Sequence, residues 1–161
     1  MTRTEYNNSV DQFSDDIFRF ILKLCRSKEL AEDIVQESYL VLWEHVREIA
    51  SEKAKPFLFT TAYRKMIDIF RREKRNSDIE TVSSSHNWYE NETPDLQQVL
   101  HAALERLSEI QRTVVLLRDY ENYSYKEIAE ITNLNENQVK VYLFRARFFM
   151  KEYIRKPDLV V

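Results

Sequence analysis

Two carboxylates at helical spacing are the first residues that could do chemistry. Asp33 and Glu37 lie four residues apart in "ELAEDIVQESYLVLWEHV", a stretch over 29–46 with the apolar periodicity of a helix. Paired carboxylates act as general acid and base only in a pocket that separates their pKa values, and this stretch indicates no pocket. A docking face for a basic protein partner is favoured, and a solvated acidic face is the alternative. The predicted docking residues are Asp33, Gln36, Glu37 and Leu40.

A strip of positive charge interleaved with aromatic residues covers 55–75, which holds seven Lys or Arg residues in a chain of net charge −3. On a helical wheel one side is apolar, and the opposite side carries cations together with Phe57, which we expect to be exposed. Cations neutralise phosphates and an exposed ring stacks on an unpaired base, so this face is typical of a nucleic-acid surface. A solvated helix with i,i+4 ion pairs is the alternative. The predicted contacts are Phe57, Thr61, Arg64, Lys65, Arg71, Arg72 and Arg75.

A helix-turn-helix pattern lies in the second half of the chain. Ser124 is predicted to cap a short helix over 125–131, and Asn135 to cap a second helix after a turn at 132–134. Asn133 takes the turn position that requires left-handed backbone, where Asn is the least unfavourable residue after Gly.

The second helix of this pattern has the polarity of a DNA-reading helix. Its early polar residues point outward, as those of a recognition helix do towards base edges, and later cations reach phosphates. Phe144 and Phe148 also point outward, which favours a hydrophobic protein partner or cover by the end of the chain. The predicted duplex contacts are Asn135, Asn137, Gln138, Lys140, Val141, Arg145 and Arg147.

Other kinds of site find little support. The single cysteine, Cys25, and three scattered histidines give no zinc pattern and no catalytic triad, so no metal and no catalytic residue are expected. Glycine is absent, which excludes glycine-rich phosphate loops, and no cofactor is expected. No stretch is long and apolar enough for a membrane span or a signal peptide, so the cytoplasm is the expected location.

The composition indicates helices in two small domains. Without glycine and with three prolines, the chain has few breaker residues, and strand-like alternation is hard to find. Residues 77–99 carry five acidic and no basic side chains in a polar stretch without helical periodicity. We therefore expect an all-α protein with domains at 1–76 and 97–161, joined by an acidic flexible linker over 77–96.

With these motifs identified, the chain resembles the extracytoplasmic-function sigma factors of bacterial RNA polymerase over nearly all of residues 10–155. "LAEDIVQESYLVLWEHV" is similar to their region-two docking helix, and "FLFTTAYRKMIDIFRREKR" to the following helix, which melts and reads the minus-ten element. "LERLSEIQRTVVLLRDYENYSYKEIAEITNLNENQVKVYLFRAR" is similar to region four, which reads the minus-thirty-five element. Phe57 stands in place of the usual tryptophan, and Tyr63-Arg64 in place of Arg-Asn.

The resemblance implies a division of roles among the predicted site residues. The acidic helix would dock on the clamp coiled coil of core RNA polymerase, the basic strip would melt the minus-ten element, and the helix-turn-helix would read the minus-thirty-five element beside the flap. It implies three partners: core polymerase, promoter DNA and an anti-sigma factor. It implies no catalysis, small-molecule substrate or membrane insertion.

Two other functions are weighed against this one. A stand-alone helix-turn-helix regulator would bind duplex DNA while the N-terminal half senses a ligand, and an adaptor protein would have no DNA role. The acidic helix at 29–46 argues against the regulator, and the basic strip at 55–75 argues against the adaptor.

Overall fold

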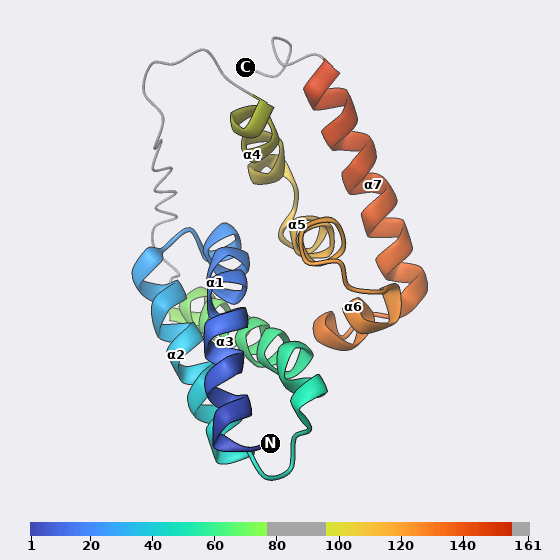
Figure 1. The fold of residues 1–161 in the computed structure, drawn as a ribbon. Helices are drawn as coiled ribbons and strands as arrows, with labels where there is room; N and C mark the ends of the chain where they lie inside the picture. The colour runs from blue at the N-terminus through green and yellow to red at the C-terminus, as the bar shows by residue number, and fades with distance from the viewer. Residues whose placement is uncertain (77–95, 156–161) are drawn as a thin grey trace.

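The computed structural model describes residues 1–76 and 96–155, and every regular element in these two ranges is a helix (Figure 1). The all-α prediction is confirmed, and the predicted linker lies almost wholly outside the described residues. The elements are α1 (Arg3–Cys25), α2 (Lys28–Glu44), the 3-10 turn η1 (Ser51–Lys53), α3 (Ala54–Asn76), α4 (Leu96–Arg106), α5 (Glu109–Val115), the π-helical turn η2 (Leu116–Tyr120), α6 (Tyr125–Thr132) and α7 (Glu136–Arg155).

Helices α1, α2 and α3 pack into the first domain. A capping box starts α1, because the Thr2 side chain accepts from the Glu5 backbone at 3.1 Å and the Glu5 carboxylate accepts from the Thr2 backbone at 2.7 Å. Tyr39 of α2 donates to the Ser9 carbonyl at 2.8 Å, which ties α2 to α1. The buried face of α3 is Ala54, Leu58, Phe59, Ala62, Tyr63 and Met66.

Helical periodicity predicts a buried face of α2 formed by its large apolar residues, and the observed face is rotated from it. The predicted face is Val35, Tyr39, Leu42, Trp43 and Val46. The face that contacts α1 and α3 is Ala31, Ile34, Ser38, Tyr39 and Leu42. Ala31 and Ser38 are small, so they let the neighbouring helices approach closely. The large ring of Trp43 stays about half exposed at the edge, 5.0 Å from the Tyr6 ring.

Helices α4 to α7 form the second domain. A buried guanidinium holds the connection between α4 and α5. Arg112, only 7% exposed, donates to the carbonyls of Leu104 at 2.8 Å, Glu105 at 2.9 Å and Leu107 at 3.0 Å. These carbonyls lie at the end of α4 and just after it, where helical hydrogen bonds run out. The Leu104 carbonyl also accepts from the Leu107 backbone at 3.2 Å, and the Glu105 carbonyl from Arg26 at 3.2 Å. Burial lowers the pKa of Arg112. The inward stripe of α7 is Val139, Leu143, Ala146 and Met150, as its periodicity predicts.

The two domains contact each other. One cluster of buried apolar side chains continues from α1 and α3 into α5, α6 and α7. In Figure 1, α6 lies next to α3 at the point where the two domains meet. The short helix of the helix-turn-helix is therefore the part of the second domain that packs beside the basic strip.

Candidate functional site

The acidic docking residues share one exposed face of α2. Ser27 begins this helix by accepting from the Leu30 backbone at 3.2 Å. The side chains of Asp33, Gln36 and Glu37 are all exposed, and Leu40 is 61% exposed in line with them. Trp43, one turn after Leu40 and about half exposed, extends this apolar centre. Sequence patterning misses Trp43, because it assigns the ring to the core.

An ion pair joins this acidic face to the basic strip. Lys65 Nζ lies 3.5 Å from Glu37 Oε2, so a predicted polymerase contact and a predicted DNA contact bind each other. Both side chains are partly exposed, so the pair adds at most about 1 kcal/mol to stability. The pair matters mainly because it holds α2 and α3 in position relative to each other.

The predicted DNA contacts of α3 fall into two groups. Arg64, Arg71, Arg72 and Arg75 are exposed, while Thr61 and Lys65 are half-buried. These cations and Thr61 lie on α3, away from the residues that it buries in the first domain.

The expectation of a freely exposed Phe57 is wrong. The ring is half-buried against the core, and its centroid lies 6.2 Å from that of His45. The reason is that Phe57 sits in the first turn of α3, directly after η1, where its ring packs against the core and lies near His45, which follows α2. A wheel drawn for α3 alone lacks these neighbours.

The helix-turn-helix geometry matches the sequence prediction. Ser124 accepts from the Glu127 backbone at 3.1 Å and starts α6, which ends one residue later than predicted. Asn133 has φ 59° and ψ 34°, the left-handed backbone expected of it. Asn135 accepts from the Gln138 backbone at 2.7 Å, and the Gln138 amide oxygen accepts from the Asn135 backbone at 3.0 Å.

This capping box assigns a structural role to two predicted base contacts. The side chains of Asn135 and Gln138 hold each other's backbone, so they position the start of α7 rather than point freely outward. An exposed groove of about 260 Å³ opens beside them. It is lined by Asn135, Asn137, Gln138, Val141, Tyr142 and Arg145. Lys140 is also exposed, with Nζ 5.8 Å from the Tyr125 ring.

Arg147, a predicted phosphate contact, is bound inside its own domain. Its Nε donates to Asp119 Oδ2 at 3.2 Å, and Nη2 donates to Asp119 Oδ1. The hydrogen bonds that Arg147 donates to Asp119 raise the pKa of Arg147. The sequence indicates a free cation because Asp119 lies 28 residues earlier and only the fold brings it close.

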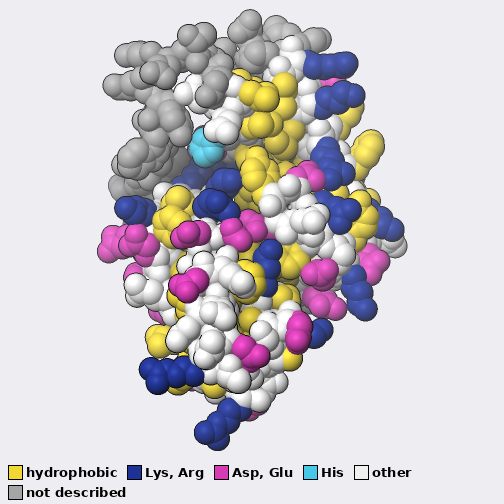
Figure 2. Space-filling view, in the orientation of Figure 1, with side chains coloured by type: hydrophobic (Ala, Val, Ile, Leu, Met, Phe, Trp, Pro, Cys, Tyr) yellow, Lys and Arg dark blue, Asp and Glu magenta, His cyan; other side chains and the backbone are white. Residues whose placement is uncertain are grey.

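The outward side of α7 alternates apolar and basic residues. Phe144 is 72% exposed and Phe148 is 61% exposed, so both point to solvent as predicted. Figure 2 shows hydrophobic and basic side chains alternating along the edge of the molecule that α7 occupies. The remaining residues of the chain, 156–161, lie outside the described part, so cover by the C-terminal tail is untested.

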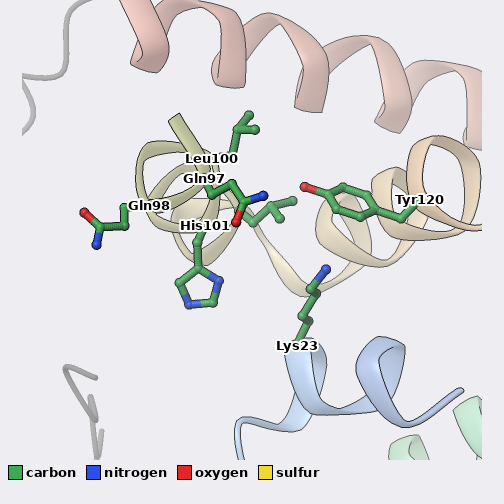
Figure 3. A pocket seen from close by; sticks show the side chains of 7 residues that line it. Lys23, Gln97, Gln98, Leu100, His101 and Tyr120 are labelled. Carbon is green, nitrogen blue, oxygen red and sulfur yellow. The ribbon is translucent and has the colours of Figure 1, made fainter. Parts of the chain in front are cut away.

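Other surfaces offer less chemistry. A hollow of about 420 Å³ lies between α1 and α4, where the Lys23 amine points towards the Tyr120 ring (Figure 3). No group of three His, Cys, Asp or Glu side chains among the described residues could hold a metal ion. In the same residues, no helix combines the length and apolarity that crossing a bilayer requires.

Comparison with known proteins identifies the family. The Sigma-70 region 2 family matches residues 10–76, and the Sigma-70, region 4 family matches residues 97–149. The ECF RNA polymerase sigma factor SigM of Bacillus subtilis (strain 168) is 31% identical over 86% of this chain and 88% of its own. The RNA polymerase sigma factor SigV of the same strain is 32% identical over 93% of this chain and 91% of its own.

A solved structure agrees with these sequence matches. The sigma factor RpoE, in its complex with the anti-sigma factor NepR from Bartonella quintana, matches with a TM-score of 0.73 and 25% identity over 93% of this chain and 96% of that chain. The chain belongs to the extracytoplasmic-function sigma factors. It binds core RNA polymerase and directs promoter-specific initiation of transcription, and a stand-alone regulator is not favoured.

Proposed function

We propose that the two domains divide the steps of initiation, and that the exposed face of α2 docks the chain on polymerase. The observation that carries this proposal is the continuous exposed row of Asp33, Gln36, Glu37 and Leu40. Carboxylates around an apolar anchor complement a basic surface with an apolar centre. By family resemblance that surface is the clamp coiled coil of core RNA polymerase.

Docking through α2 would deliver α3 to the promoter. The strip needs little affinity of its own, because attachment to polymerase raises its effective concentration at the DNA. Arg64, Arg71, Arg72 and Arg75 would neutralise phosphates of the minus-ten element, with Lys65 held by Glu37 until docking. Phe57 and Thr61 would contact an unpaired base after strand opening, for which the half-buried ring must expose its face.

The second domain would read the minus-thirty-five element through the outer side of α7. Asn137, Lys140, Val141 and Arg145 are the exposed candidates beside the groove at the start of that helix. Val141 supplies an apolar contact of the kind that recognises a thymine methyl group, and Arg145 the charge for a phosphate. Asn135 and Gln138 would act by fixing the helix start, and Arg147 by tying α7 to η2.

An anti-sigma factor is the proposed regulatory partner. RpoE was captured with the anti-sigma factor NepR, and this chain matches RpoE over nearly its whole length. The chain would carry out no catalysis of its own and would work in the cytoplasm, where bacterial polymerase transcribes.

Charge reversal of the docking face tests the proposal. Asp33→Lys combined with Glu37→Lys should weaken binding to core polymerase at least tenfold, because two attractive contacts become repulsive. Glu48→Lys, an exposed change outside the face, is the matched control. Binding is measured by fluorescence anisotropy of labelled chain with core enzyme, and unchanged affinity of the double variant would remove the docking role.

Reconstituted transcription tests the function as a whole. Core polymerase, this chain and a promoter library should give transcripts that start only when both proteins are present. A stand-alone regulator would instead protect duplex DNA without polymerase. Phe57→Ala should slow open-complex formation more than it weakens duplex binding, and equal effects would contradict a role in melting.

A further inference from the structure

The two predicted DNA-reading parts lie too close together to use a promoter as they stand. Arg64 and Arg71 of α3 line one groove of about 370 Å³ with Thr132 and Asn133 of the helix-turn-helix. By their names, the minus-ten and minus-thirty-five elements are about 25 base pairs apart, or about 85 Å at 3.4 Å per pair. Helices that share a groove of this size cannot reach both elements at once.

One side chain reaches across this contact between domains. The Tyr123 ring, 4% exposed, lies 5.3 Å from the Phe59 ring at 71° and 5.3 Å from Lys55 Nζ. Its backbone belongs to the second domain, because its N–H donates to the Leu117 carbonyl at 3.0 Å and its carbonyl accepts from Arg118 at 2.9 Å. The backbone thus fixes the local fold of the second domain, and the ring contacts the first.

The hydroxyl at the end of this ring is unsatisfied. Tyr123 Oη is buried, and no donor or acceptor of the described residues reaches it. Burial raises the pKa of Tyr123, and Glu121 and Glu127 raise it further, so the group stays a neutral donor without an acceptor. An unpaired buried hydroxyl opposes the contact that buries it, whereas opening returns it to water.

Two other contacts between the domains are more exposed than the buried cluster that joins them. Lys23 Nζ lies 4.2 Å from the centre of the Tyr120 ring (Figure 3), and Arg26 donates to the Glu105 carbonyl at 3.2 Å. Tyr120 is 45% exposed, and the Arg26 bond is exposed as well, so water competes for both contacts. Tyr123 is therefore a better point for a test than either of these contacts, and its unpaired hydroxyl sets it apart within the buried cluster that joins the domains.

We propose that this structure is a closed form of the free sigma factor in which Tyr123 acts as the latch between the domains. Its ring holds the helix-turn-helix against α3, and its unpaired hydroxyl keeps the closed form close in free energy to an open one. The chain must open before it can span a promoter. This inference rests on the proposed DNA roles of α3 and α7, but closure itself is a property of the free chain.

Energy transfer within the free chain tests the latch. Dyes are attached through Asp11→Cys and Lys151→Cys, both exposed positions, in a Cys25→Ser background. Transfer is followed over a urea series below the unfolding range, so that the ratio of closed to open chains is resolved for every variant. Tyr123→Phe keeps the ring and removes the hydroxyl, and Tyr123→Ala removes both.

The latch predicts opposite changes for these two variants. Tyr123→Phe should raise the ratio of closed to open chains about tenfold, or about 1.4 kcal/mol, and Tyr123→Ala should lower it by a similar factor. Tyr153→Phe, a matched change on α7 whose ring stacks on Phe149 within its own domain, should leave it unchanged. Circular dichroism checks that the helices of each variant are intact.

The same variants have a predicted effect on promoter binding. Because only open chains are competent, a tenfold lower open fraction should weaken apparent promoter affinity about tenfold. The latch would be overturned if Tyr123→Phe and the parent chain had equal ratios of closed to open chains. It would also be overturned if the parent chain were mostly open. The energy-transfer readings use no polymerase, so they leave the docking role intact, and failure of the docking test leaves closure intact.

Discussion

Arg145 and Arg147 are two residues apart on α7, yet the structure assigns them opposite roles. Arg145 is exposed beside the groove at the helix start, whereas Arg147 binds Asp119 through two guanidinium nitrogens. Replacing each arginine by Gln removes one charge and keeps a long polar side chain. We expect Arg145→Gln to act on DNA affinity and Arg147→Gln to act on stability.

The magnitudes follow from exposure and contact type. The Arg147–Asp119 pair has side chains 49% and 37% exposed, so its two-point contact adds about 1 kcal/mol, near the upper end for surface pairs. That loss lowers the melting temperature by about 3 °C in a chain of this size. A lost phosphate contact instead lowers the slope of log K against log salt by about 1, with little change in melting.

Two assays separate the roles. Duplex affinity for the minus-thirty-five element is measured at several salt concentrations for both variants, beside thermal unfolding. A cycle with Asp119→Asn should show coupling of about 1 kcal/mol with Arg147→Gln and none with Arg145→Gln. The reasoning fails if Arg147→Gln lowers the salt slope as much as Arg145→Gln does, or if it shows no coupling to Asp119.

Three further predictions concern stability. Asn133→Ala should lower the free energy of unfolding by about 1 kcal/mol in urea titrations because of its left-handed backbone, and Asn133→Gly should not. Arg112→Met should lower it by about 3 kcal/mol, since three carbonyls each lose one hydrogen bond worth about 1 kcal/mol; a loss under 1 kcal/mol would contradict this. Burial raises the pKa of Tyr63 from 10.0 to about 12, so its neutral form adds stability below pH 10 that is lost as the pH rises through 12. In alkaline titrations followed by circular dichroism, Tyr63→Phe should remove that part of the loss.

Local chemistry accounts for the features that the sequence predicts correctly. The start of α6 at Ser124, the left-handed turn at Asn133 and the inward stripe of α7 depend on hydrogen bonds and spacings within a few residues. The exposed acidic row of α2 follows in the same way from helical periodicity and charge. The family assignment also follows from the sequence, since the motifs stand in their order along the chain, and the comparisons confirm it.

Contacts between distant segments account for the features that the sequence misses. Phe57 packs against the core and near His45, and Arg147 is bound by Asp119, so a helical wheel misjudges both. Arg112 precedes a run of apolar residues, a signal of a buried cation, but its three carbonyl acceptors are visible only in the fold. Sequence patterning cannot place such partners, because they become neighbours only when separate helices pack.

The sequence by itself determined that this chain is helical, that it has two domains and which family it belongs to. Only the tertiary structure decided which side chains stay free to meet a partner. It also brought the two domains into contact, with the Tyr123 ring of the second buried against Phe59 of the first. The physical reason is range: capping and periodicity act within a helix, whereas burial and pairing depend on which helices pack together.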